Sequence, residues 1–383
     1  MKRFVVLDSW RGIAACLVAL HHFESLIDIN GYPPYGHLHV SLLRNAYLFV
    51  DLFFVLSGFV IAANYQQRVL DGFGVGRFLL LRLGRLYPLH FAMLAVAVAL
   101  KLLLILTPAA ASITPAAPFS TPQEAPHTIL ANLLLIHSLH VYDFLTWNSQ
   151  SWSISTEFYT YVIFAACLVG LRKHGWIALL AAMIGGPVLI ATLSEHNMDA
   201  TYDWGMIRCV YGFAAGVISW NFYSRWNGKL RKWLSGDIAE WCTIGLMVAF
   251  VSVSGTTLLS VAAPYIFGLV VLVFAFEAGT ASTLLRLRPL VFLGTVSYSI
   301  YMTHVFIARR LFDAGRVFDK LWHLDFMGTR PWQGDIAYLF YMAMVIAMSY
   351  FTYRWIERPG RDWVRNRVET RQQTAASRGI VSV

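Results

Sequence analysis

The sequence predicts an all-α integral membrane protein with about ten transmembrane helices and both termini in the cytoplasm. The first observation is composition: 57% of the 383 residues are hydrophobic and 13% are charged. Soluble domains, by contrast, are about 45–50% apolar and about 25% charged. The second is that the apolar residues occur in long blocks, and about 20 apolar residues cross a bilayer core of about 30 Å. An ordinary soluble enzyme and a disordered protein are therefore excluded.

Ten apolar blocks are candidate spans, and short charged connections separate most of them. They lie at 9–27, 46–64, 86–107, 151–170, 176–193, 206–221, 237–254, 258–278, 290–308 and 336–356. A further apolar piece at 129–141 is too short to cross the membrane, and we expect it to lie in the interface or to dip back in.

The basic residues supply the third observation, because they predict the orientation. If the N-terminus lies inside and the spans alternate, 21 of the 30 lysines and arginines fall on the inner side and six on the outer side. This split follows the positive-inside rule and places both termini in the cytoplasm. The net charge of +9 is then a property of cytoplasmic loops, and we expect no nucleic-acid partner.

The remaining composition adds few constraints. The four cysteines lie in apolar blocks without CxxC spacing, so we expect neither a disulfide framework nor a metal site. Asp8 and Arg11 interrupt the first apolar run, which favours a retained helix over a cleaved signal peptide. We expect one transmembrane domain over 1–360 and a basic cytoplasmic tail, partly disordered, over 361–383.

Charged groups in the first and fourth spans are informative, because a charge inside a bilayer costs roughly 2.5–3.5 kcal/mol. Arg11 and His22 are eleven residues apart and so share one helix face, with a rise of roughly 16 Å between them. Asp8 is spaced to pair with Arg11. Glu157 of the fourth span can lie at a depth similar to that of His22, and Ser153 and Tyr161 extend its polar face. Snorkelling and packing are the alternative roles.

Two other spans carry polar groups. Ser297, Tyr301 and His304 form a stripe that we expect to face protein rather than lipid. The second span buries Asp51 and places Ser57 and Gly58 where a close helix approach and packing are expected.

The cytoplasmic segment RFLLLRLGRLYPLH contains Arg77, Arg82 and Arg85. One interpretation is an interfacial helix that contacts anionic lipids. The other is a phosphate clamp, because guanidinium groups match phosphate geometry. In the later motif YRWIERP, Arg354 and Glu357 are spaced for a local ion pair.

Six strings in this order resemble the acyltransferase-3 family of integral-membrane acyltransferases. They are LDSWRGIAACLVALHHF, DLFFVLSGFVI, RFLLLRLGRLYPL, SWSISTEFY, LGTVSYSIYMTH and IERP. The family includes bacterial enzymes that O-acetylate O-antigen, exopolysaccharides and nodulation factors. Trp10 stands where the family often has leucine, and the chain ends too soon for the esterase-like C-terminal domain of some relatives.

The resemblance implies a multi-pass protein of the bacterial inner membrane. Such a protein transfers an acetyl or other acyl group from cytoplasmic acyl-CoA, a substrate rather than a bound cofactor, to a hydroxyl of a carbohydrate. It implies His22 as base or acyl carrier, with Glu157 orienting the imidazole or the acceptor. The residues expected to bind CoA phosphates are Arg11, Arg77, Arg82 and Arg85. The residues expected near the acceptor or behind the reacting groups are Asp51, Trp152, Ser153, Tyr301 and His304.

Two other functions remain open at this point. One is a proton-coupled transporter or flippase of a glycan precursor, with Glu157, His22 and His304 as a proton relay. The other is a scaffold subunit of a polysaccharide export complex. The sequence also leaves open the acceptor, the acyl chain length and the oligomeric state, a homo-oligomer included.

Overall fold

A computed structural model describes residues 2–30, 37, 39–106, 117–322 and 330–380, and every regular element in these ranges is helical. The α-helices are α1 (Val5–Asn30), α2 (Ser41–Arg44), α3 (Phe49–Ile61), α4 (Gln67–Leu70), α5 (Val75–Leu106), α7 (His127–Leu133), α8 (Trp152–Leu171), α9 (Gly175–Leu193), α10 (Gly205–Leu234), α11 (Asp237–Ser254), α12 (Ala263–Phe274), α13 (Thr280–Leu285), α14 (Arg288–Trp322), α15 (Pro331–Thr352) and α16 (Arg358–Ile380). Two π-helical turns, Ala62–Gln66 and Tyr353–Glu357, follow α3 and α15.

Each of the ten expected spans coincides with a helix, which confirms the all-α membrane class. Within the described ranges, seven helical stretches have the length and apolar composition of a bilayer-spanning segment. Expected spans outside this group are α1, α10 and the shorter stretch Leu258–Phe274. The piece at 129–141 forms the end of the short helix α7 and a series of turns. The exact number of crossings stays a prediction.

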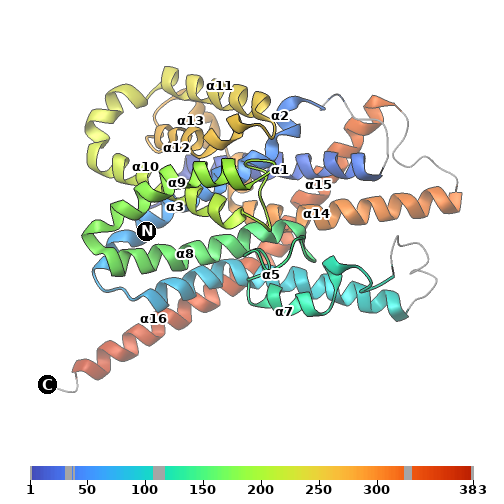
Figure 1. The fold of residues 1–383 in the computed structure, drawn as a ribbon, viewed down its shortest axis with the longest axis horizontal. Coiled ribbons are helices and arrows are strands. Elements are labelled where there is room, and N and C mark those ends of the chain that lie inside the picture. Colours follow the sequence, from blue (N-terminus) through green and yellow to red (C-terminus); the bar gives the residue numbers. More distant parts are fainter. Residues whose placement is uncertain (1, 31–36, 38, 107–116, 323–329, 381–383) are drawn as a thin grey trace.

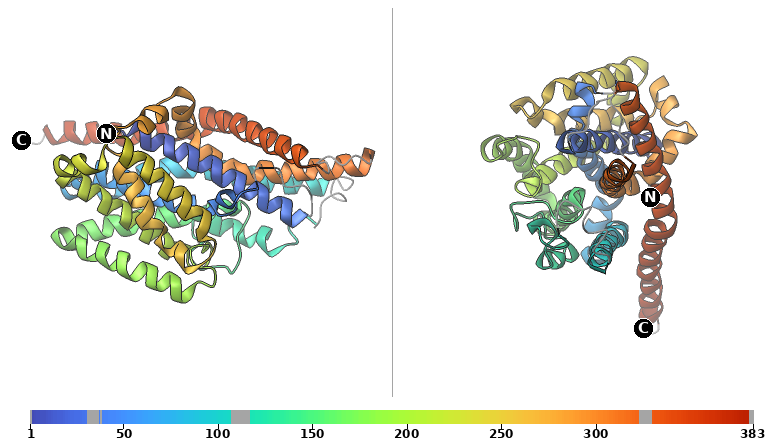
Figure 2. Two further views of the ribbon diagram at one scale, coloured as in Figure 1. Left: turned by 90° about the horizontal axis from the view of Figure 1, so that it is seen from above. Right: turned by 90° about the vertical axis from the view of Figure 1, so that its right-hand side faces the viewer.

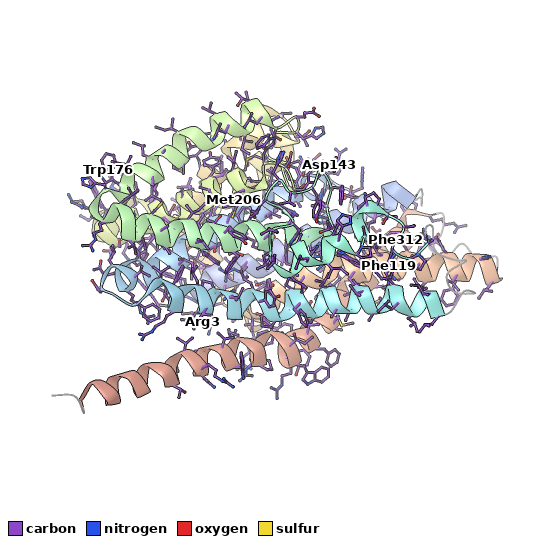
Figure 3. All side chains as sticks on the ribbon, turned by 60° about the horizontal axis from the view of Figure 1, so that its bottom comes forward. Arg3, Phe119, Asp143, Trp176, Met206 and Phe312 are labelled. Carbon is purple, nitrogen blue, oxygen red and sulfur yellow. The ribbon has the colours of Figure 1, made fainter. Side chains whose placement is uncertain are left out.

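Most of the long helices run along one axis of the molecule, so the bundle has two ends (Figure 1). The two chain ends lie toward the same end of the bundle in both long views (Figures 1 and 2). We call this the termini end. Trp176 lies toward it, whereas Asp143 and Phe312 lie toward the opposite end (Figure 3). Two chain ends on the same side of the bundle are what an even number of membrane crossings requires.

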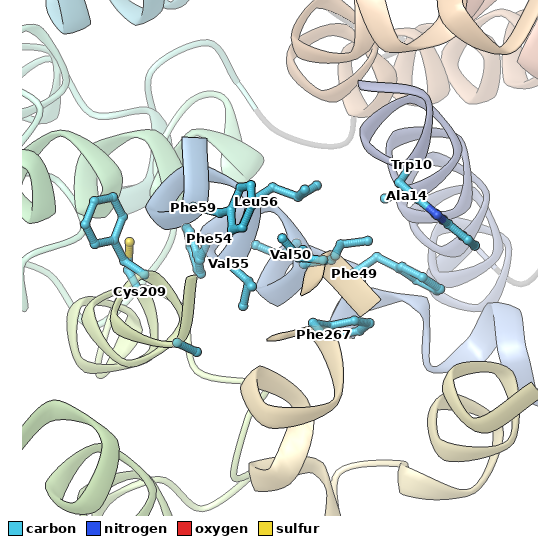
Figure 4. Packing of buried hydrophobic residues seen from close by; sticks show 14 of the residues in the cluster. Trp10, Ala14, Phe49, Val50, Phe54, Val55, Leu56, Phe59, Cys209 and Phe267 are labelled. Carbon is cyan, nitrogen blue, oxygen red and sulfur yellow. The ribbon is translucent and has the colours of Figure 1, made fainter. Parts of the chain in front are cut away.

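The centre of the bundle is α3. In the stretch Ala46–Leu70, 83% of the most apolar window is buried, against 17% for Gly175–Leu193 at the periphery. Aromatic and aliphatic side chains of α3 pack with α1, α10 and α12 (Figure 4). Phe49 contacts Phe267 of α12, for example, with ring centroids 5.8 Å apart. Because α3 is surrounded by protein, its polar residues can meet only other helices.

Glycines allow the closest helix contacts in this core. A Cβ atom on Gly58 of α3 would lie 2.0 Å from the carbonyl oxygen of Phe213. One on Gly216 of α10 would lie 1.9 Å from the carbonyl oxygen of Val55. No side chain fits at these positions, so α3 and α10 touch backbone to backbone. The close approach expected at Gly58 is confirmed.

Helices α1 and α14 pack in the same manner along most of α1. A Cβ atom on Gly294 of α14 would lie 2.3 Å from the carbonyl oxygen of Asp8, and Gly12 of α1 faces the backbone of Leu293 and Gly294. The contact brings the polar face of α1 beside the polar stripe of α14.

Helix α16 crosses the expected domain boundary at residue 360 without a break. It packs on α5, where Gly84 faces the side chain of Val364 and Gly360 faces Pro88. The first part of the expected tail is therefore a helix docked on the bundle.

Candidate active site

A cavity lies among α1, α3, α5, α8 and α14, and we call it the arginine cavity; it encloses about 700 Å³ of space, the part open to solvent included. Its polar lining residues are Arg11, Ser57, Arg82, Arg85, Ser153, Glu157, Tyr161, Ser297, Tyr298 and Tyr301.

Three guanidinium groups from two helices line this cavity. Arg11 of α1 is paired with Asp8, as expected, at 3.6 Å, and 17% of its side chain is exposed. Arg82 and Arg85 lie three residues apart on α5 and therefore on one face. Arg82 donates a hydrogen bond of 3.0 Å to the hydroxyl of Tyr65. Of the four arginines expected to bind CoA phosphates, the structure brings these three together, and Arg77 lies elsewhere.

The two π-helical turns each place a side chain beside one of these arginines. The first carries Tyr65, the partner of Arg82. The second carries Glu357, which accepts a 2.8 Å hydrogen bond from Ser299 and exerts the largest favourable charge interaction on Arg85. Regular helical spacing pairs Glu357 with Arg354 instead. A π-turn adds one residue to the turn and so rotates the side chains that follow, and a regular spacing does not reveal that rotation.

Glu157 of α8 faces the arginine cavity. Its Oε1 atom accepts hydrogen bonds from Ser57 at 2.6 Å and from Tyr161 at 2.5 Å. Ser153 and Tyr161 lie on the same face, as expected. The packing role expected for Ser57 is corrected by the structure. Its hydroxyl donates to the Glu157 carboxylate, which links α3 to α8, and it lines the cavity.

A second cavity, of about 1180 Å³, lies farther along α1 and α14, and we call it the histidine cavity. It includes Asp143, which lies toward the end of the bundle opposite the termini (Figure 3). Its polar and aromatic lining residues are His22, Ser25, Thr121, Gln123, Glu124, Asp143, Phe144, Thr146, Trp147, Ser149, Tyr202 and Arg309.

The hydrogen bond of His22 determines which ring nitrogen carries its proton. Its Nδ1 atom lies 2.9 Å from the carbonyl oxygen of Val18. A carbonyl only accepts, so Nδ1 donates and Nε2 of the neutral ring has a free lone pair. The ring of His304 lies 4.9 Å from that of His22, between centroids. The Nδ1 atom of His304 donates to the carbonyl oxygen of Tyr301 at 2.6 Å.

His304, Tyr301 and Ser297 are buried, which confirms that the stripe on α14 faces protein. His22 and Glu157, however, line different cavities. That Glu157 orients the imidazole of His22 stays a prediction. Tyr301 lines the arginine cavity, and its ring lies 5.7 Å from that of His304.

Three of the expected site residues lie away from both cavities. Asp51 accepts two hydrogen bonds from the guanidinium of Arg208, at 2.9 and 2.8 Å, and both side chains are almost completely buried. The ring of Trp152 covers this guanidinium at 5.3 Å. Arg77 lines a groove between α5 and α16. Asp51 and Trp152 thus belong to a buried ion pair, and Arg77 is not part of the arginine cluster.

These features define a class of protein: a helical membrane protein with one cavity lined by three guanidinium groups and a second cavity, farther along α1, lined by a histidine. Comparison with known proteins identifies the class as a membrane acyltransferase. The acyltransferase-3 family profile, described as an acyltransferase domain, matches residues 4–354. The chain belongs to this family.

One curated relative is "Protein 2 in picA locus" from Rhizobium radiobacter. It is 31% identical to this chain over 198 residues, which is 51% of this chain and 96% of the relative. No solved structure matches the chain.

Proposed function

We propose that this protein transfers an acetyl or other short acyl group from cytoplasmic acyl-CoA to a hydroxyl of a carbohydrate across the bacterial inner membrane. The observation that supports it best is the order of the two cavities. Arg11 and His22 lie on one helix, roughly 16 Å apart along its axis, and Arg11, which lines the arginine cavity, is nearer the start of α1. Helix α1 starts toward the termini end (Figure 2). The excess of basic residues assigns the termini end to the cytoplasm.

In this proposal, Arg11, Arg82 and Arg85 hold the CoA phosphates. Guanidinium groups form paired, charge-assisted hydrogen bonds with phosphate oxygens. The cavity is proposed to receive the pantetheine arm and the thioester, while the nucleotide stays near its cytoplasmic mouth.

His22 then acts as the general base. Its Nε2 atom takes the proton from the acceptor hydroxyl, and the hydroxyl oxygen attacks the thioester carbonyl carbon. The new carbon–oxygen bond forms, the carbon–sulfur bond breaks, and the leaving thiolate takes the proton from the imidazolium. An acyl-imidazole formed at the same Nε2 atom is the two-step form of this reaction.

Glu157 is assigned a positioning role on the donor side. Its hydrogen bonds to Ser57 and Tyr161 hold the carboxylate at the cavity wall. From there it exerts a favourable charge interaction on Arg11 and on Arg85. This keeps the guanidinium groups gathered before the donor arrives.

The histidine cavity is the proposed acceptor site. Carboxylate, amide and hydroxyl side chains such as those of Asp143, Gln123 and Thr121 can hydrogen-bond sugar hydroxyls. Tyr202 and Phe144 offer aromatic faces for the ring of a sugar.

The test uses purified protein in lipid nanodiscs with labelled acetyl-CoA and a polysaccharide extract of the host envelope. His22→Ala should lower acceptor-dependent CoA release by roughly 100-fold or more, the usual contribution of a general base. His21→Ala is the matched control, because the Nδ1 atom of His21 is bound to the carbonyl of Leu43 and His21 does not line the histidine cavity. Near wild-type release by folded His22→Ala protein would remove His22 from the mechanism. A transporter would release no CoA.

A further inference from the structure

Side chains that contact one another connect the two cavities: the ring centroid of His304 lies 4.9 Å from that of His22 and 5.7 Å from that of Tyr301. No residue in the described ranges lines both of them. Along α14, Tyr301 lines the arginine cavity and Val305 lines the histidine cavity. His304 lies between them with no exposed surface, and its Nε2 atom has no hydrogen-bond partner in the described part of the chain.

One part of this connection is firmly attached. Gln150, in the turn before α8, donates its side-chain amide to the carbonyl of Met302 at 2.8 Å. Asn148 donates to the same carbonyl at 3.2 Å. Two amides on one carbonyl hold the turn against α14. On either side of Gln150, Ser149 lines the histidine cavity and Ser153 the arginine cavity.

The other part of the connection consists of the side chains of Tyr301 and His304, whose ring centroids lie 5.7 Å apart, and the Tyr301 side chain is hydrogen-bonded across to the start of α8. The Tyr301 hydroxyl donates to the backbone carbonyl of Gln150 at 3.0 Å and accepts from the hydroxyl of Ser153 at 2.8 Å. Its ring lies edge-on to Phe53, with centroids 5.6 Å apart. One rotation of this side chain breaks both hydrogen bonds and leaves the backbone of α8 and α14 in place.

We propose that Tyr301 is the removable partition between the donor and acceptor cavities. This inference rests on the proposed acyl transfer. While the Tyr301 hydroxyl is hydrogen-bonded to Gln150 and Ser153, the side chain shields the thioester in the arginine cavity from water in the histidine cavity. When the ring swings away, the arginine cavity opens toward His304 and the ring of His22 beside it. Tyr301 is thus a positioning residue that suppresses hydrolysis.

The side reaction that Tyr301 prevents is hydrolysis of the thioester, which needs no reactant other than water. A water molecule from the histidine cavity attacks the thioester carbonyl carbon, the carbon–sulfur bond breaks, and the products are free CoA thiol and the carboxylic acid. Closed active sites suppress such side reactions by excluding water. The partition therefore predicts a change in the ratio of hydrolysis to transfer, which a purely structural role of Tyr301 would leave unchanged.

The experiment measures both reactions for Tyr301→Ala, Tyr301→Phe and Ser153→Ala in nanodiscs with labelled acetyl-CoA. Hydrolysis without acceptor should rise about tenfold in Tyr301→Ala, because water is no longer excluded, while transfer to the envelope polysaccharide extract falls. Tyr301→Phe keeps the ring but loses the hydroxyl, and Ser153→Ala loses one hydrogen bond, so both should show smaller increases. Tyr211→Phe is the matched control, because its buried hydroxyl binds the carbonyl of Val261 and lines neither cavity.

An unchanged ratio of hydrolysis to transfer in folded Tyr301→Ala protein would overturn the partition. If Tyr301→Ala does not fold, an unchanged ratio in Ser153→Ala does so instead. A failure of the proposed function looks different: wild-type protein would then release no CoA with or without the extract.

Discussion

Two groups of arginines and carboxylates lie inside this helical bundle, and they differ in what satisfies their charges. Arg208 uses its guanidinium on both oxygens of Asp51 and on the carbonyls of Ala200 and Tyr47. Its side chain is 1% exposed. The arginine cavity instead gathers three guanidinium groups around open space, with Glu157 on its wall.

The surroundings of a charge in a membrane segment therefore indicate whether its role is structural or functional. A charge inside a membrane is expensive, so its presence marks a structural or functional need but not which of the two. Arg208 donates to both oxygens of Asp51 and to two backbone carbonyls in the buried core, whereas the cluster of Arg11, Arg82 and Arg85 has a cavity beside its charges. The closed pair is structural, and the open cluster is the candidate binding site.

The largest expected effect is on the closed pair. Asp51→Ala leaves the buried guanidinium of Arg208 unpaired and should lower the free energy of unfolding by roughly 3–5 kcal/mol. Thermal unfolding of the purified protein in detergent measures the loss. The double variant Asp51→Leu, Arg208→Met removes both charges and should recover most of the stability. Equal stability of Asp51→Ala and wild type would contradict the structural assignment.

The next effect is on the open cluster. Arg85→Ala should raise the KM for acetyl-CoA by roughly tenfold, the loss expected for one charge-assisted phosphate contact. Steady-state CoA release measures it. Arg77→Ala is the control on the same helix, because Arg77 lines the groove beside α16 and should not change KM. The same rise in both variants would mean that general surface charge, and not the cavity, binds the donor.

The smallest effect concerns the carboxylate of the open cluster. Glu157→Gln keeps an acceptor for the hydroxyls of Ser57 and Tyr161 but removes a negative charge near the phosphate site. Because Glu157 is proposed to hold the guanidinium groups together, the KM for acetyl-CoA should rise, by about two- to threefold for a partly screened interaction. Measuring KM at low and high salt tests the electrostatic origin, since the difference should shrink at high salt. A fall in KM would show that the carboxylate mainly repels the donor phosphates and would contradict the positioning role.

Local sequence patterns were enough to predict the helices and the polar face of each. All ten expected spans coincide with helices, because an apolar block of this length must satisfy its backbone within the bilayer. The faces of α8 and α14 follow from helical spacing alone, and both Glu157 with Tyr161 and the stripe ending at His304 are placed as that spacing predicts. So is the cluster of Arg82 and Arg85, which are three residues apart.

The partners of those faces were decided only by the tertiary structure. Asp51 meets Arg208, 157 residues away, and Ser57 meets Glu157, 100 residues away. These meetings depend on which helices approach most closely, and that depends on small contacts such as Gly58 on Phe213. The π-turns that place Tyr65 and Glu357 are likewise invisible to a regular period. A helical period specifies a direction and a depth, whereas a site requires a neighbour, and helix packing alone supplies it.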